Sequence, residues 1–122
     1  MKHISAAIAL CLSLMFFASP ARAQHSASLS WTASSDAAAN PTLGYNVYRL
    51  AGACPASGTS GFTKLNTSPV TATIYSDATV GLGSVCYYVT ATLNGAESLP
   101  SNTASAVVLP GAPTLLKITA TT

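Results

Sequence analysis

From His25 to Leu109 apolar residues tend to recur at every second position, and the helical period of 3.6 is absent. Near the start, Leu29 and Trp31 alternate with serine and threonine, which predicts a strand with one buried face. Further strands are expected over 44–50, 62–65, 71–76, 85–93 and 103–109. Turn-forming residues separate them, and Asn94-Gly95 is typical of a hairpin turn. Short strands at this spacing indicate an all-β antiparallel sandwich or barrel.

Residues 1–23 are expected to be a signal peptide rather than part of the fold. Lys2 gives a short positive start, Ile4–Ala18 is an almost uninterrupted apolar run, and Ala21-Arg22-Ala23 supplies the small residues that a signal peptidase needs. An uncleaved membrane anchor is the alternative, but about 15 apolar residues ended by Pro20 are short for a bilayer of roughly 30 Å. Cleavage after Ala23 leaves one domain over 24–109, in the periplasm, at the cell surface or outside the cell.

The charge balance excludes two classes of partner. The chain has five Lys or Arg and three Asp or Glu, and two of the basic residues, Lys2 and Arg22, lie in the signal segment. The exported chain therefore carries three basic and three acidic side chains. A neutral domain has no electrostatic attraction for a phosphate backbone or an anionic membrane. Nucleic acid is not an expected partner, and neither is a membrane after signal cleavage.

Three cysteines become two after cleavage, because Cys11 lies in the signal segment. In an oxidising compartment Cys54 and Cys86 form either one disulfide or two buried free thiols. A disulfide would close a loop of about 33 residues, for which the chain-entropy model gives roughly 3–4 kcal/mol. Two sulfurs and His25 are too few ligands for a metal site, so no metal is expected.

The acidic residues do not predict catalysis. Asp36, Asp77 and Glu97 are spread over separate predicted loops and strand ends, and no glycine-rich phosphate loop or nucleophile motif is present. We interpret Asp36 as a turn residue, Asp77 as the end of a strand and Glu97 as part of a hairpin. The chain is therefore not expected to be an enzyme or to need a cofactor.

Several segments together resemble a known family. They are SASLSWTAS (26–34), GYNVYR (44–49), FTKLN (62–66), YSDATV (75–80), YYVTA (87–91) and NGAESLPSN (94–102). In this order and spacing they resemble a fibronectin type III domain of the kind found in secreted bacterial proteins, over most of Ser26–Leu109. The resemblance implies a two-sheet, immunoglobulin-like β-sandwich in which strands A, B and E face strands C′, C, F and G.

The resemblance also implies a core and a cysteine pairing. Its end of strand C lies beside the start of strand F, so that Cys54 and Cys86 should meet. Trp31 corresponds to the buried tryptophan of strand B. The core residues that it implies are Leu29, Trp31, Tyr45, Val47, Tyr87 and Val89.

The same orientation turns Tyr48 and Tyr88 outward on adjacent strands. If exposed, the two rings could stack on a sugar or anchor a protein partner. Alternatively, they cover one another as a cross-strand pair. The main function expected is a secreted, non-catalytic interaction or spacer module that contacts a protein or polysaccharide, whose identity the sequence does not give.

The family's opening strand A is missing, because the expected mature chain runs from Gln24 straight into strand B. The tail PGAPTLLKITATT (110–122) resembles that strand, displaced to the other end of the domain. It is either a linker remnant or a strand supplied to its own or a neighbouring sandwich. The linker 110–113 reaches at most about 14 Å, whereas strand A begins about 20–25 Å away. Antiparallel pairing with its own sandwich is therefore difficult, and a parallel fold-back stays open, whereas donation to a neighbour needs no crossing. The alternative function is therefore a structural subunit that assembles head to tail into homo-oligomers.

Overall fold

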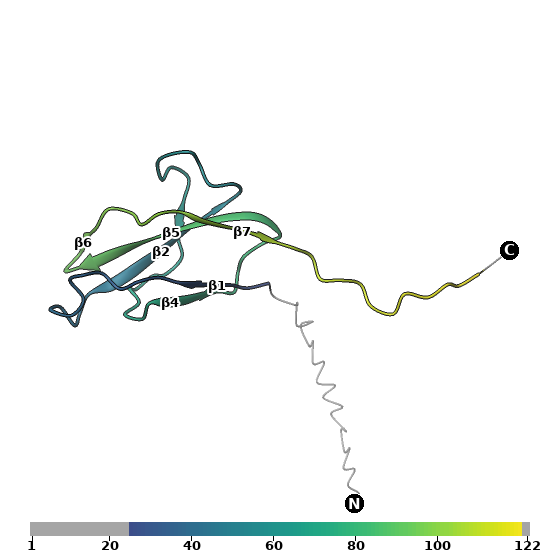
Figure 1. Ribbon diagram of the computed structural model, residues 1–122, viewed down its shortest axis with the longest axis horizontal. Coiled ribbons are helices and arrows are strands. Elements are labelled where there is room, and N and C mark those ends of the chain that lie inside the picture. Colours follow the sequence, from purple (N-terminus) through teal and green to yellow (C-terminus); the bar gives the residue numbers. More distant parts are fainter. Residues whose placement is uncertain (1–24, 121–122) are drawn as a thin grey trace, which may run out of the picture.

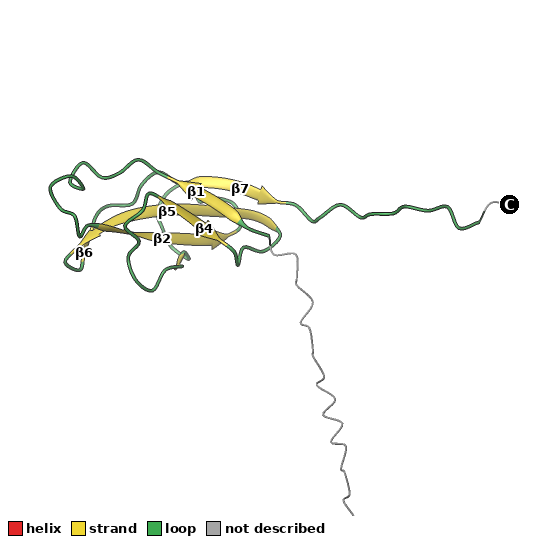
Figure 2. Cartoon of the chain, turned by 90° about the horizontal axis from the view of Figure 1, so that it is seen from below, coloured by secondary structure: helices red, strands yellow, loops and turns green. Residues whose placement is uncertain are grey.

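The computed structural model describes residues 25–120, and these residues form strands and loops without a helix (Figures 1 and 2). The expected signal peptide, 1–23, lies outside the described residues. The strands pair only in the antiparallel sense, which confirms the all-β expectation. Their bounds are β1 Ala27–Ser30, β2 Gly44–Ala51, β3 Thr63–Lys64, β4 Ile74–Asp77, β5 Gly83–Leu93, β6 Ala96–Glu97 and β7 Ala104–Val108.

Two sheets of unequal size form the two layers. The small sheet is the pair β1-β4, and the large sheet has the order β3-β2-β5 with β6 and β7 sharing the other edge of β5. β6 pairs with the end of β5 and β7 with its beginning. Between them, the hydroxyls of Ser98 and Ser101 accept hydrogen bonds from the amides of Ala91 and Val89, each at 2.9 Å. Side chains thus continue the pairing where no strand does.

The β5-β6 connection is the hairpin turn expected at Asn94-Gly95. Both residues have positive φ, 52° and 83°, as a tight two-residue turn requires. Leu93 consequently pairs with Ala96.

The core lies between the two sheets and draws mainly on β2 and β5. Tyr45, Val47, Tyr87 and Val89 are buried, as the resemblance implies, and Val47 is fully enclosed. The remaining two expected core residues, Leu29 and Trp31, pack against this cluster but are only partly buried. Trp31 lies just after β1 and contacts Tyr45 edge to face, with ring centroids 5.4 Å apart. Its burial is incomplete, because β1 is an edge strand with no neighbour beyond it.

Asp77, the last residue of β4, fastens the small sheet to the large one. Its side chain is 2% exposed. Nη1 of Arg49 in β2 donates to both carboxylate oxygens at 2.8 and 3.0 Å, and the hydroxyl of Tyr87 in β5 donates at 2.7 Å. Burial would raise the pKa of this carboxyl, but the hydrogen bonds from Arg49, Tyr87 and Thr79 outweigh it and lower the pKa from its usual 3.8. The charged form of Asp77 is therefore the form that holds the sheets together.

The C-terminal tail leaves the body at the end of β7 and runs away from it (Figures 1 and 2). Residues 110–120 are exposed and belong to no strand. The tail therefore does not supply a strand to its own sandwich in this structure.

We predict that Asp77→Ala lowers the free energy of unfolding by about 2–4 kcal/mol, because it leaves Arg49 and Tyr87 without their acceptor. Arg49 is 25% exposed, and water will compensate part of the loss. Urea unfolding would measure the change. Asp36→Ala, at an exposed turn position, is the control and should stay within about 0.5 kcal/mol of wild type. Equal effects of the two substitutions would contradict the role of Asp77.

Candidate functional site

The outer face of the large sheet, on the side away from the core, carries the two tyrosines singled out in the sequence. β5 turns Cys86, Tyr88 and Thr90 toward this face, and all three are buried. The loop 52–62, which connects β2 to β3, covers part of this face (Figure 1). The part of the face around Cys86 and Tyr88 is therefore occupied by the protein's own chain.

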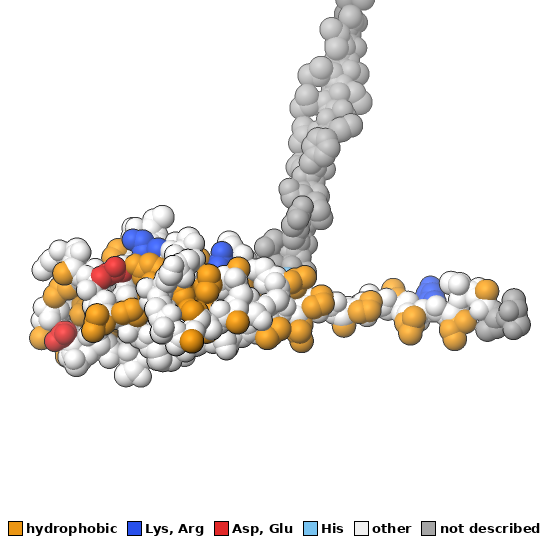
Figure 3. Space-filling view, turned by 90° about the horizontal axis from the view of Figure 1, so that it is seen from above, with side chains coloured by type: hydrophobic (Ala, Val, Ile, Leu, Met, Phe, Trp, Pro, Cys, Tyr) orange, Lys and Arg blue, Asp and Glu red, His pale blue; other side chains and the backbone are white. Residues whose placement is uncertain are grey.

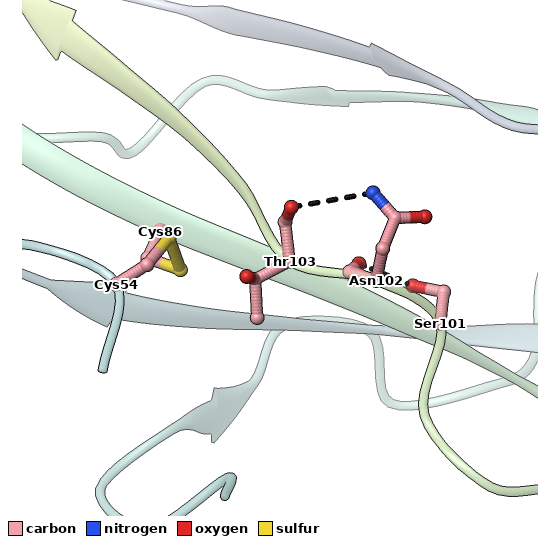
Figure 4. The surroundings of a disulfide bond; sticks show 5 residues. All are labelled: Cys54, Cys86, Ser101, Asn102 and Thr103. Carbon is pink, nitrogen blue, oxygen red and sulfur yellow. Dashed lines mark hydrogen bonds between the residues drawn. A yellow bond between two sulfur atoms is a disulfide. The ribbon is translucent and has the colours of Figure 1, made fainter. Parts of the chain in front are cut away.

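The disulfide Cys54–Cys86 ties this loop to β5. The two Cα atoms lie 5.1 Å apart, and the bridge closes a loop with a sequence separation of 32. Figure 4 shows the sulfurs beside β5, close to the segment Ser101–Thr103 that leads into β7. The structure thus confirms one disulfide and excludes the alternative of two free thiols.

The aromatic cluster next to the disulfide is packed against itself. Tyr48 and Tyr88 are directly opposite in the β2-β5 register and stack with ring centroids 4.6 Å apart and an interplanar angle of 10°. Phe62, from the end of the covering loop, packs edge-on against Tyr88 at 4.7 Å. Tyr88 is only 8% exposed. Tyr88 is therefore not exposed, and of the two interpretations given by the sequence the structure has the cross-strand pair, in which each ring covers the other.

Glu97 joins three strands on the same face. A single carboxylate oxygen, Oε1, accepts hydrogen bonds from Asn46 Nδ2 at 2.8 Å, from Thr90 Oγ1 at 2.7 Å and from the Tyr48 hydroxyl. These donors come from β2 and β5, whereas Glu97 ends β6. The carboxylate thus locks the hairpin β5-β6 onto the outer face.

The electrostatics of this cluster favour a fixed hydrogen bond over proton transfer. The donors, Tyr48 first, then Asn46 and Thr90, lower the pKa of Glu97 from its usual 4.5 to about 2. The pKa of Tyr48 is raised to about 12, mainly because the hydroxyl is partly removed from water and next because it donates to the Glu97 carboxylate. At neutral pH Glu97 therefore remains a charged acceptor and Tyr48 a protonated donor.

The sequence places Glu97 in a hairpin but does not indicate its hydrogen-bond partners. Two of them, Asn46 and Tyr48, lie 51 and 49 positions away in the chain. The sequence does contain one signal of this cluster. By alternation along their strands, the side chains of Asn46, Tyr48 and Thr90 all point to the outer face of the sheet. A hairpin carboxylate beside three outward donors is a recognisable arrangement once the β2-β5 register is known.

Within residues 25–120, no three His, Cys, Asp or Glu side chains gather closely enough to hold a metal ion. The same part of the chain contains no helix that is long and apolar enough to span a membrane. A scan against protein-family models gives no match, and a search of curated proteins finds no significant relative.

We predict that Glu97 contributes stability above its usual pKa of 4.5 and loses this contribution as the pH falls toward its folded pKa of about 2. The sign follows because the folded carboxyl binds its proton more weakly than the unfolded one. Carbon-detected NMR titration of the side-chain carboxyl should give a midpoint near pH 2.

Two matched variants test the cause of this shift. Tyr48→Phe removes the strongest hydrogen bond to Glu97 and should raise its midpoint toward 4.5. Tyr88→Phe keeps the stack but removes a hydroxyl that does not bond Glu97, and should leave the midpoint unchanged. A wild-type midpoint near 4.5, or equal shifts in the two variants, would contradict the assignment.

We predict that reducing the disulfide lowers the free energy of unfolding by about 3–4 kcal/mol, because it frees a loop of this length in the unfolded chain. Urea unfolding with and without reductant would measure the loss. The core of Tyr45, Val47 and Tyr87 does not depend on the bridge, so the reduced protein should remain folded without denaturant. Peptide mapping that recovers Cys54 and Cys86 as free thiols from the oxidised protein would disprove the pairing.

Proposed function

We propose that the protein is a secreted, non-catalytic module that makes contacts with other proteins, built on a fibronectin type III-like sandwich. The observation that carries the contact role is the apolar surface on β7, on the segment before it and on the tail after it (Figure 3). Large apolar side chains there are well over half exposed: Leu99, Val107, Leu109, Leu115, Leu116 and Ile118. Accumulated apolar surface of this kind is typical of protein interaction sites.

Two features support the family part of the proposal. β1 and β4 form one sheet, in which the resemblance places strands B and E. β3, β2, β5 and β7 lie in the other sheet, in which it places strands C′, C, F and G. Trp31 and Tyr45, two residues that the resemblance assigns to the core, contact each other.

The charged side chains support a structural use. Arg49 and Asp77 pair across the two sheets, and Glu97 accepts three hydrogen bonds from neighbouring strands. In each case the group serves as a cross-link within the fold.

Among possible partners, proteins fit the surface better than polysaccharides. The sugar-binding interpretation required exposed rings at Tyr48 and Tyr88, and these rings are stacked on each other. The exposed apolar residues are aliphatic, and aliphatic side chains suit protein contacts more than sugar stacking.

Export is supported by the disulfide. Cys54–Cys86 requires an oxidising compartment to form and persist, which agrees with the signal peptide expected over 1–23. The proposed location is outside the cytoplasm: in the periplasm, at the cell surface or in the medium.

Site-specific photo-crosslinking in the producing cell would test the contact role. We predict that a photoreactive residue at Leu99 or Val107 gives adducts with another protein, because both side chains are exposed apolar positions near β7. The control is Ser60, exposed in the loop 52–62. Adducts from all three positions alike, or from none, would contradict the contact role and leave a spacer. An adduct of twice the protein's own mass would identify a second copy of this chain as the partner.

A further inference from the structure

The small sheet leaves a groove uncovered on the large one. A pair of strands, β1 and β4, faces the broader sheet of β3, β2, β5 and β7. Beside β1, on the side away from β4, the structure has a groove of about 620 Å³ between β1 and β7. Its walls include Leu29 and Trp31 on one side and Ala104 and Ala106 on the other, with Val89 of β5 between them. The space corresponds to one strand missing from the small sheet.

The groove offers unpaired backbone groups along β1. Trp31 N–H donates to Thr73 O at 3.0 Å, in register with the β1-β4 pairs. Antiparallel pairing alternates between residues that face the partner and residues that face away from it. Counting back from Trp31, the amides of Ser28 and Ser30 therefore face away from β4, toward the groove. A strand entering the groove would find donors and acceptors ready for pairing.

The tail has the composition of a strand that fits this groove. Leu116 and Ile118 share one side of an extended chain and are 97% and 82% exposed. Lys117, the only charged residue of the tail, belongs to the opposite side. The groove lining contains no charged residue, and the small side chains of Ala104 and Ala106 leave room for larger ones. An uncharged groove thus matches the uncharged side of the tail.

The tail of the same molecule is poorly placed to pair antiparallel with β1. β7 ends, and β1 begins, at the same end of the body (Figure 1). The linker after Val108 would first have to cross the length of the groove, and the strand would then have to return through it. A tail from another molecule can enter at the opposite end of the groove, so it passes along the groove once, in the antiparallel direction.

We propose that the groove between β1 and β7 binds the segment Leu116–Ala120 of a second copy of this chain as an added strand. Leu116 and Ile118 fill the groove, and the backbone pairs with the free edge of β1. Donor and acceptor are different surfaces of one molecule, so the contact is heterologous. It either closes as a reciprocal exchange between two copies or continues head to tail.

The first test varies the donor. Sedimentation velocity of the exported full chain should show a mass that rises with concentration. The double variant Leu116→Asp, Ile118→Asp should weaken association at least about 100-fold, since it places charges in an uncharged groove. The matched control Leu115→Asp, Thr119→Asp adds the same charges to the opposite side and should associate like wild type.

The second test varies the acceptor with a matched control. Ser28→Pro removes an amide that faces the groove but belongs to no β1-β4 hydrogen bond, so it should block association and leave the fold intact. Ser76→Pro makes the same change on the opposite edge of the small sheet and should associate like wild type. Urea unfolding of each variant separates loss of association from loss of fold.

The third test mixes the donor variant with the acceptor variant. The donor variant retains a groove and Ser28→Pro retains a tail, so mixing these two non-associating variants should give a 1:1 complex. A wild-type chain that stays monomeric up to its solubility limit, variants that all associate equally, or a mixture that gives no complex would overturn the proposal. A monomer whose amides over Leu116–Ala120 resist hydrogen exchange would place the tail in its own groove and would also overturn it.

Discussion

The position of the small sheet depends on the buried carboxylate of Asp77. β1 and β4 bring only a few partly buried side chains to the core, among them Leu29 and Tyr75. Hydrophobic burial alone therefore fixes this pair weakly. Asp77 adds bonds to Arg49 on β2 and Tyr87 on β5, so one side chain sets how β4 lies across both central strands. Its lowered pKa indicates that these bonds outweigh the cost of removing the charge from water.

The two faces of the large sheet are therefore used differently. On the outer face, the disulfide, the Tyr48–Tyr88 stack and the Glu97 hydrogen bonds cover the sheet with its own loops. On the inner face, the small sheet covers only part of the surface, and the groove beside β1 remains. β1 thus keeps an unpaired strand edge beside this groove, whereas the rings of Tyr48 and Tyr88 cover each other.

Much of the fold was predictable from the sequence because its signals are local. Alternation identified the strands, Asn94-Gly95 identified a hairpin, and the cysteine count limited the pairing. The loop 52–62 has no periodic pattern, so its position over Tyr88 could not be inferred from nearby residues. The partner of Asp77 did have a signal. By alternation, Arg49 points to the same inner face as Tyr45 and Val47. A buried cation needs a negatively charged partner, and this domain has only a few acidic residues that could serve.

The edges of the two sheets differ in how they are protected against unwanted pairing. β3, at the edge of the large sheet, is two residues long and carries Lys64, and both properties discourage strand addition. β1 carries serines at the positions whose amides face its free edge, with neither charge nor proline. At β4, the other edge of this sheet, Ile74 and Ser76 are exposed, and a hollow of about 580 Å³ is lined by residues of both β1 and β4. The expected mature chain has no net charge to keep copies apart, so the unprotected edge of β1, beside an uncharged groove, is open to strand addition. Under the exchange proposed above, Leu116 and Ile118 of a second copy's tail fill that groove, and the added strand removes the unpaired edge.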